Sequence, residues 1–324
     1  MKISHSYLYV PSVTENNEAV IQEFEQRGIS MQKIQNALGR STRFLIPEKS
    51  TENTFTMSVD AAKKVLEQSH INIADIDMII FVSATPEYHM PTNAIKIHRA
   101  LGAKHETLCY DMNSNCIGGF VALDQVSKYL AGSKNRHKAL VICSERFSDK
   151  SGKENPIIRF CFSDSALAYI IEKDDTDSGL IDVLYHTDST FTDTIVYPPN
   201  GHSCYRYEDE IFWDTGFDGS GSVNFALNMI DDFLKRNHLT IKDIQLFLFS
   251  QLSAKNIQTI INHYEIPADK APFYGREIAY TGSSSPLAAL DLYQRNVAKL
   301  QQGDYVLIWT LGAGYQAGLM LWKY

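Results

Sequence analysis

An internal repeat constrains the fold of this chain more than any other feature of its sequence. Residues 61–84 and residues 229–252 align without a gap, at an offset of 168 positions. The positions that coincide are His70 with His238, Ile73 with Ile241, Asp75 with Asp243 and Ile76 with Ile244. Each stretch runs from an amphipathic helical pattern through a short polar linker into an apolar segment, at 78–82 and at 246–249, which is typical of a buried strand.

A second match supports the same repeat. The triplet Ala-Leu-Asp occurs at 122–124 and again at 289–291, an offset of 167. Each triplet lies in an apolar helical pattern, and each pattern leads to another buried strand, around Val141 in the first case and Ile308 in the second. The order helix, strand, helix, strand therefore recurs. It predicts a duplicated α/β fold whose sheets are covered on both faces.

The two copies divide the chain into an N-terminal half, 1–173, and a C-terminal half, 174–324. The charged run EKDDTDS at 172–178 is the expected linker between them. An exposed hairpin turn explains the same composition equally well.

The composition is that of an ordinary globular chain, with 44% hydrophobic and 21% charged residues among 324. The net charge of −8 disfavours a nucleic-acid binder, because neutralising phosphates requires a basic surface. No apolar run is long enough to span a membrane, and the N-terminus lacks the apolar segment of a signal peptide, so we expect a cytoplasmic protein. Five cysteines, an odd number without a Cys-x-x-Cys pair, argue against a disulfide scaffold.

Cys116 is the candidate nucleophile. It stands between a polar turn, 113–115, and an apolar helical run that begins near Ile117, and a predicted strand precedes the turn. The N-terminus of a helix offers free N–H groups and the positive end of the dipole, which favour a thiolate and lower the pKa of a cysteine. Gly118 and Gly119 leave room for another backbone to come close. The alternative is a cysteine that only packs the start of the helix.

Two loops of the second half are predicted to lie near Cys116. The loop 281–286 precedes the helix that corresponds to the Cys116 helix, so we expect the two turns to face one pocket. Gly312, Ala313 and Gly314 follow a buried strand and form a small-residue loop whose N–H groups suit an oxyanion hole. A plain tight turn is the other interpretation of that loop.

Over essentially its whole length, the chain resembles the thiolase-like condensing enzymes, specifically β-ketoacyl-acyl carrier protein synthase III. The resemblance rests on 81–103, 111–119, the segment 159–172 with Asp164 in SDSALA, and the closing LIWTLGAGYQAGLMLWKY. It implies a five-layer αβαβα sandwich, usually a homodimer. It also implies that Cys116 takes an acyl group from coenzyme A or acyl carrier protein. No resident cofactor is implied, because the substrate thioesters carry their own phosphopantetheine.

Two catalytic positions of that family hold other residues in this chain. Ser250 stands where the family has the histidine of His-Gln-Ala-Asn, and Tyr280 stands where it has the asparagine of Gly-Asn-Thr-Ser. The histidine and asparagine stabilise the enolate that forms when a malonyl thioester loses carbon dioxide. Ser250 and Tyr280 can each donate one hydrogen bond, but neither acts as a base near neutral pH. Ordinary malonyl condensation is therefore not expected, whereas acylation of Cys116 needs only a thiolate and an oxyanion hole.

His202 is the candidate replacement for the missing base. It lies in a polar, turn-rich insertion, which in relatives covers the acyl pocket, and a solvated loop histidine is the favoured interpretation. No two histidines or cysteines combine metal-ligand spacing with a carboxylate, so we expect no metal site.

The sequence leaves three functions open. The first is an acyltransferase that forms an acyl-Cys116 thioester and passes the acyl group to a second substrate, in fatty-acid or polyketide-type biosynthesis. The second is a non-catalytic subunit that supports a complete ketosynthase. The third is a module that binds acyl or phosphopantetheine groups without turnover. The expected partners are an acyl carrier protein or a coenzyme A thioester, together with a second copy of the chain or a homologous ketosynthase.

Overall fold

Two β-sheets form the centre of the molecule, for which the computed structural model describes residues 1–47, 49–216 and 221–324. The first sheet has the strand order β1 (Lys2–Tyr9), β7 (Ser165–Glu172), β6 (Lys138–Glu145), β4 (Met78–Val82) and β5 (Leu108–Met112). β4 runs parallel to both β5 and β6, whereas β7 is antiparallel to β6 and β1. All of β4 is buried, as expected of a parallel strand that is covered on both faces, and the strand predicted at 78–82 is confirmed.

The second sheet has the strand order β11 (Ile244–Phe249), β12 (Tyr305–Gly312), β13 (Gln316–Lys323) and β8 (Gly179–Thr187). β11 and β12 are parallel, and the other pairs are antiparallel. β11 begins two residues before the strand predicted at 246–249, because the buried Ile244 extends it. The predicted division between 1–173 and 174–324 lies in the turn that joins β7 of the first sheet to β8 of the second.

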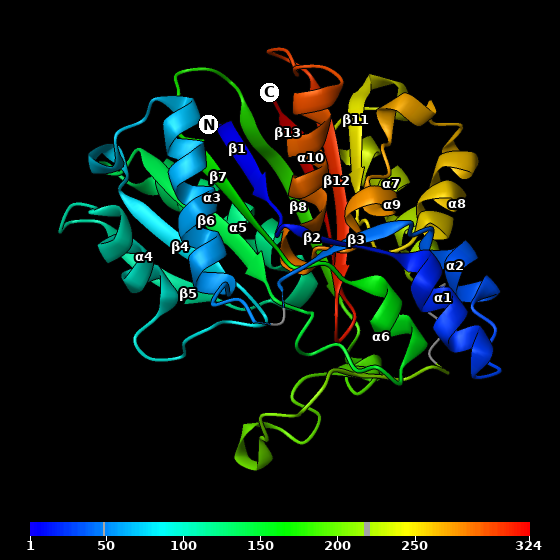
Figure 1. Ribbon diagram of the computed structural model, residues 1–324. Coiled ribbons are helices and arrows are strands. Elements are labelled where there is room, and N and C mark those ends of the chain that lie inside the picture. The colour runs from blue at the N-terminus through cyan, green and yellow to red at the C-terminus, as the bar shows by residue number, and fades with distance from the viewer. Residues whose placement is uncertain (48, 217–220) are drawn as a thin grey trace.

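Helices cover and separate the two sheets (Figure 1). α3 (Thr54–Ser69) and α4 (Asn93–Leu101) cover the outer face of the first sheet, and α7 (Gly221–Arg236) and α8 (Ala254–Tyr264) cover the outer face of the second. α5 (Gly118–Gly132) and α10 (Ser285–Asn296) lie between the sheets, where their apolar side chains join strands of both sheets in one core. The predicted five-layer αβαβα sandwich is confirmed.

The internal repeat is visible in the backbone geometry. His70 after α3 and His238 after α7 both adopt a left-handed conformation, with φ of 56° and 58°. Each leads through a one-turn 3-10 helix, η1 (Ile73–Asp75) or η5 (Ile241–Asp243), into the next strand, β4 or β11. The inner helices repeat too, because η2 (Asn115–Ile117) precedes α5 and η7 (Gly282–Ser284) precedes α10.

The remaining elements decorate the sandwich. They are β2 (Val13–Asn16), α1 (Asn17–Gln26), α2 (Gln32–Leu38), β3 (Thr42–Leu45), α6 (Pro156–Cys161), η6 (Ala268–Lys270) and α9 (Gly275–Ile278). α2 packs against α8, and α1 packs against α6. An insertion of four short elements projects at the bottom of Figure 1: η3 (Ser189–Phe191), β9 (Ile195–Val196), η4 (His202–Cys204) and β10 (Phe212–Trp213). Among the described residues, no helix has the length and apolar character that crossing a membrane requires.

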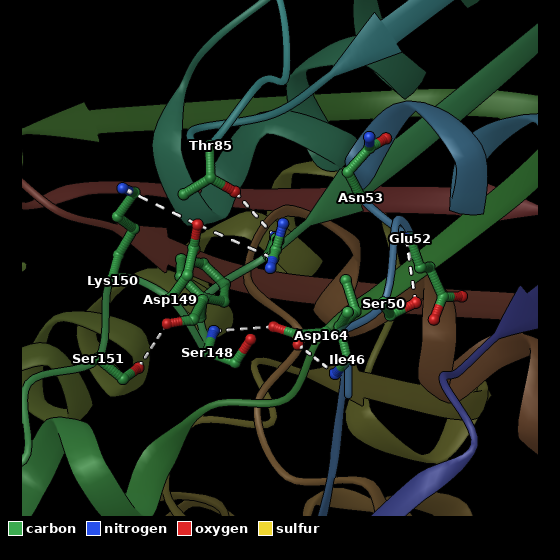
Figure 2. Close-up of polar contacts among 12 residues, drawn as sticks. Ile46, Ser50, Glu52, Asn53, Thr85, Ser148, Asp149, Lys150, Ser151 and Asp164 are labelled. Atoms are coloured by element: carbon green, nitrogen blue, oxygen red, sulfur yellow. Dashed lines mark hydrogen bonds and ion pairs between the residues drawn. The ribbon is translucent and has the colours of Figure 1, made fainter. Parts of the chain in front are cut away.

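Asp164 joins three segments of the first half (Figure 2). Its carboxylate accepts hydrogen bonds from the backbone N–H groups of Ile46 at 2.8 Å and Ser148 at 2.9 Å, and its own N–H donates to the carbonyl of Phe44 at 2.9 Å. Burial raises the pKa of this carboxyl, and the hydrogen bonds oppose the rise. The acidic residue of SDSALA therefore has a structural role, because it ties β3 and the loop after β6 to the start of β7.

Candidate active site

Cys116 lies in η2, at the turn between β5 and α5. Asn115, directly before it, has a positive φ of 52°, so the chain turns sharply after the polar segment. The structure thus places Cys116 in the strand, turn and helix arrangement that the sequence predicts.

Gly118 and Gly119 allow the two halves to meet beside the thiol. A Cβ atom at Gly119 would lie 2.5 Å from the carbonyl oxygen of Ser283, and one at Gly118 would lie 3.4 Å from Ser283 Cβ. The second turn therefore packs directly against the first. The expectation that both turns face one pocket is wrong: Ser284 is buried, and its hydroxyl hydrogen-bonds to Thr281, whereas Cys116 lines a cavity.

The cavity beside Cys116 has a volume of about 480 Å³ and is lined by both halves of the chain. Apolar and aromatic side chains form much of its wall: Phe162, Ile195, Trp213, Leu252, Trp309 and Tyr315. Its polar lining includes Ser250, Asn256, Tyr280 and two exposed lysines, Lys33 and Lys255. Such a cavity suits an extended, largely apolar ligand with a few polar groups.

The Cys116 thiol is held mostly in its neutral form. Burial raises the pKa of the thiol to about 11, and the nearby Glu145 carboxylate and Cys161 thiol add to the rise. A hydrogen bond from the Tyr280 hydroxyl and one from the backbone N–H of Ala313 oppose it. The predicted lowering of this pKa by the helix start is therefore wrong for the free protein, because desolvation outweighs the favourable donors.

Tyr280 and Ser250 both reach the site, as their positions in the sequence suggest. The Tyr280 backbone is fixed beside α6: its N–H donates to the Cys161 carbonyl at 3.0 Å, and its carbonyl accepts from Ser163 N–H at 3.0 Å. Tyr280 is 1% exposed, and burial together with Cys116 holds the pKa of its phenol well above the ordinary value. Among the described residues, Ser250 Oγ has no hydrogen-bond partner of ordinary geometry, although it lies near enough to Tyr280 to oppose that rise. Neither group takes up a proton near neutral pH; the Tyr280 hydroxyl donates to Cys116, whereas Ser250 Oγ keeps its donor unused among the described residues.

The loop Gly312-Ala313-Gly314 also lines the Cys116 cavity. It turns tightly, with Tyr315 N–H donating to the Gly312 carbonyl at 3.1 Å and Gly314 at a φ of 76°. The backbone N–H of Ala313 lies close enough to Cys116 to lower the pKa of the thiol.

His202 lies elsewhere. It is exposed in the insertion and lines a different, more polar cavity of about 640 Å³, where its ring contacts His89 at a centroid distance of 5.3 Å. It does not line the Cys116 cavity. Within the described ranges of the chain, no group of three histidine, cysteine or acidic side chains is arranged to hold a metal ion.

Glu145 is a site residue that the sequence analysis missed. It is buried at the end of β6, and its carboxylate accepts hydrogen bonds from Ser83 Oγ at 3.2 Å, Thr85 Oγ1 at 2.8 Å and Ser283 Oγ at 2.7 Å. The backbone N–H groups of Ala84 and Thr85 donate to it as well. Burial raises the pKa of this carboxyl. An acidic residue that ends an apolar strand was the only signal available.

Trp309 was missed as well. It lines the cavity with 1% of its surface exposed, and its indole N–H has no hydrogen-bond partner among the described residues. Its strand, β12, pairs with β11. Directly after β11, the N–H of Ser250 donates to the Trp309 carbonyl at 2.8 Å. In the sequence this tryptophan is indistinguishable from the core residues of its strand.

Sequence comparisons connect this geometry with known proteins. The family described as 3-oxoacyl-[acyl-carrier-protein (ACP)] synthase III matches residues 110–189, and the C-terminal part of the same family matches residues 234–324. The β-ketoacyl-[acyl-carrier-protein] synthase III of Wolbachia pipientis is 30% identical over 274 residues, which cover 84% of this chain and 85% of that protein. The enzyme of the same name from Neisseria gonorrhoeae is 25% identical over 327 residues, covering 100% and 99%.

Solved structures show the same thiolase-like fold. The 3-oxoacyl-[acyl-carrier-protein] synthase III of Aquifex aeolicus superposes with a TM-score of 0.85 at 21% identity, covering 100% of this chain and 99% of that one. OleA of Xanthomonas campestris, solved with lauric acid and lauroyl-CoA, gives 0.85 at 15% identity, covering 99% and 98%. The priming β-ketosynthase of the R1128 polyketide pathway gives 0.84 at 20% identity, covering 99% and 95%. With the matches in sequence, the chain belongs to the β-ketoacyl-[acyl-carrier-protein] synthase III family.

Proposed function

We propose that this chain takes an acyl group onto Cys116 and passes it to a second substrate without decarboxylating a malonyl thioester. The observation that carries the proposal is the surroundings of Cys116. The thiol keeps its cavity, its Ala313 N–H and a hydroxyl donor in Tyr280, while Ser250 and Tyr280 replace the family's histidine and asparagine.

Acylation needs only groups that are present. Cys116 Sγ attacks the carbonyl carbon of a thioester, and the Ala313 N–H stabilises the oxyanion that develops. A new bond joins Sγ to the carbonyl carbon, the bond from that carbon to the donor's sulfur breaks, and the thiol proton leaves with the departing pantetheine sulfur. The Tyr280 hydroxyl donates to Sγ and so favours its anionic form before the attack.

Malonyl condensation lacks the support that it needs. Loss of one preorganised donor typically costs about 100-fold to 1000-fold in rate, and here two are replaced by hydroxyl groups. The second substrate is therefore a nucleophile that needs no decarboxylation. The two classes in view are a β-keto thioester, whose α-carbon is easier to deprotonate, and an amine or alcohol.

The donor is a phosphopantetheine thioester, carried by acyl carrier protein or coenzyme A. Support comes from the size and apolar lining of the cavity and from Lys33 and Lys255, whose charges suit a phosphate. The place of such a reaction is fatty-acid or polyketide-type biosynthesis.

Intact-mass measurement tests the proposal. The purified chain is incubated with acyl-CoA and acyl carrier protein thioesters of graded length, with Cys116→Ala as the control. We expect a mass gain equal to the acyl group, absent from the variant, and release of that group when the correct nucleophile is added. Malonyl-CoA supplied to the acylated protein is expected to lose no carbon dioxide above background. Failure of every donor to modify Cys116 would refute the proposal.

A supporting subunit of a heteromeric ketosynthase is the second candidate, and the replaced histidine and asparagine favour it. A chain in this role acquires activity only together with a complete homologue. Adding a homologue that carries both residues therefore separates the two candidates, because the first acylates alone and the second does not.

A further inference from the structure

Arg40 is a buried charge that the proposed acylation does not yet use. It is 2% exposed, and no salt bridge joins it to an acidic side chain within the described residues. Burial lowers the pKa of its guanidinium. Burying a charge without a counter-charge costs free energy of folding. Other interactions of the Arg40 guanidinium must therefore compensate for this cost.

The guanidinium holds together the two segments that carry Ser250 and Tyr280. Its Nη2 donates to the carbonyls of Gln251 at 2.9 Å and Leu252 at 2.6 Å, directly after Ser250. Its Nη1 donates to the Gly275 carbonyl at 2.9 Å, in the short helix α9 that leads to Tyr280. Arg40 thus fixes the relative position of the two hydroxyl donors.

The site is shaped for this side chain. A Cβ atom at residue 275 would lie 2.3 Å from Arg40 Nη1 and 2.7 Å from the Gln251 carbonyl, so glycine is required where the guanidinium enters. Gln251 closes the other side, because its Oε1 accepts from Tyr274 N–H at 2.8 Å. The ring of Phe273 lies 5.6 Å from the guanidinium carbon.

The charge of Arg40 reaches the nucleophile through two neighbours. Its charge interacts with the Cys161 thiol and with the Tyr280 phenol, and both of these groups interact with Cys116. The other charged groups around Cys116 are the Glu145 carboxylate, which opposes a thiolate, and the exposed Lys33 and Lys255 of the cavity. Arg40 is the buried cation of this group of side chains.

We propose that Arg40 is a positioning residue that supplies the counter-charge for one negative charge shared by Cys116, Tyr280 and Cys161. The inference rests on the proposed function, in which Cys116 must become a thiolate without a histidine beside it. The positive charge compensates the thiolate, and the three carbonyl contacts keep Tyr280 and Ser250 in place.

Alkylation of Cys116 tests the charge without an acyl donor. Rates of reaction with iodoacetamide are measured after brief pH jumps, on intact protein, with the label assigned to Cys116 by peptide mass. Arg40→Gln is expected to move the pH midpoint upward by about one unit, which slows alkylation about tenfold at about pH 8, with the high-pH limit unchanged. Arg40→Lys keeps a charge and is expected to stay near the wild-type midpoint.

Arg43→Gln is the matched control. Arg43 is also 2% exposed, but it pairs with Glu15 and is expected to leave the midpoint of Cys116 unchanged. If Arg40→Gln does not fold, it is replaced by Gly275→Ala, in which the added methyl group displaces the guanidinium. The pH midpoint of that variant is then compared with the midpoint of Arg40→Lys. The inference would be overturned if the pH midpoint of Arg40→Gln, or of Gly275→Ala, equalled that of Arg40→Lys. Faster alkylation of Cys116 in either of the first two variants, from a loosened site, would overturn it as well. The alkylation assay needs no acyl donor, so it reports the pH midpoint of Cys116 even in a protein that never accepts an acyl group. Failure of the proposed function is instead detected by the intact-mass measurement.

Discussion

The reactivity of Cys116 is decided by a balance between burial and a small number of donors. Burial raises the pKa of the thiol to about 11, while the Tyr280 hydroxyl and the Ala313 N–H lower it. A thioester substrate that fills the cavity meets the same donors. In the proposed acylation, each donor therefore affects the fraction of thiolate before the attack and the stability of the oxyanion during it.

Removing the Tyr280 hydroxyl tests this balance. In Tyr280→Phe the thiol loses a donor that favours its charged form, so its pKa rises and the thiolate fraction at a fixed pH falls. One hydrogen bond of about 0.5–1.5 kcal/mol corresponds to a rate lower by about twofold to tenfold. We expect the profile of acylation rate against pH to keep its shape and to shift to higher pH. An unshifted profile would show that the phenol does not act on Cys116.

Restoring the family's residues tests the departures. Ser250→His combined with Tyr280→Asn supplies the two donors that stabilise an enolate, and the pair is expected to gain carbon dioxide release from malonyl-CoA, by about 100-fold over the parent chain. Release of labelled carbon dioxide is the measurement. Ser250→Ala combined with Tyr280→Phe, which adds no such donor, is the control. No gain in a folded double variant would place the block to condensation elsewhere in the cavity.

Among the helices and strands, the contact between η2 and η7 holds the two halves of the repeat together. α5 can begin this close to η7 only because residue 119 is glycine, and the buried Glu145 carboxylate joins β6 to Ser283 across the same junction. The second copy of the repeat thus supports the turn that carries Cys116.

Gly119→Ala is expected to weaken this junction. The added methyl group would approach the Ser283 carbonyl to 2.5 Å and Cys143 Sγ to 3.0 Å, and overpacking of this kind costs about 1–3 kcal/mol in the free energy of unfolding. Gly132→Ala, near the end of the same helix and with no atom within 4 Å of its new Cβ, is the control and is expected to be neutral or to stabilise by up to about 1 kcal/mol. Urea unfolding measures both. Similar stabilities of the two variants would contradict the role given to the junction.

The sequence predicted the elements of this site better than its polar contacts. Cys116 is recognisable because it interrupts the apolar periodicity between a strand and a helix. Arg40 is not, because its partners are carbonyls more than 200 positions away in the chain. Trp309 and Glu145 stand in or at the end of apolar strands, where periodicity identifies only burial. Desolvation, which sets the pKa of Cys116, depends on packing that no local pattern contains.

For the chain as a whole, the open edge of the first sheet is the feature that bears on association with another chain. β5 forms that edge, and all of its residues are half-buried. Apolar side chains near it are exposed, among them Ile95 in the adjacent α4, at 50%, and Tyr129 in α5, at 45%. An apolar edge strand left open is a template for pairing with another chain.

We expect two copies to pair through β5, joining their first sheets, with the molar mass of a dimer in sedimentation equilibrium. Tyr110→Asp, in the middle of β5, places a charge at the proposed interface and is expected to give a monomer, whereas Lys2→Asp, in the strand at the opposite edge of that sheet, is expected to leave the dimer intact. Circular dichroism shows whether the monomer is folded. A monomeric parent chain, or a dimer unaffected by Tyr110→Asp, would contradict the pairing. A dimer that forms only after a complete ketosynthase is added would instead identify the homologue as the partner, because the same edge then binds a strand of a different chain.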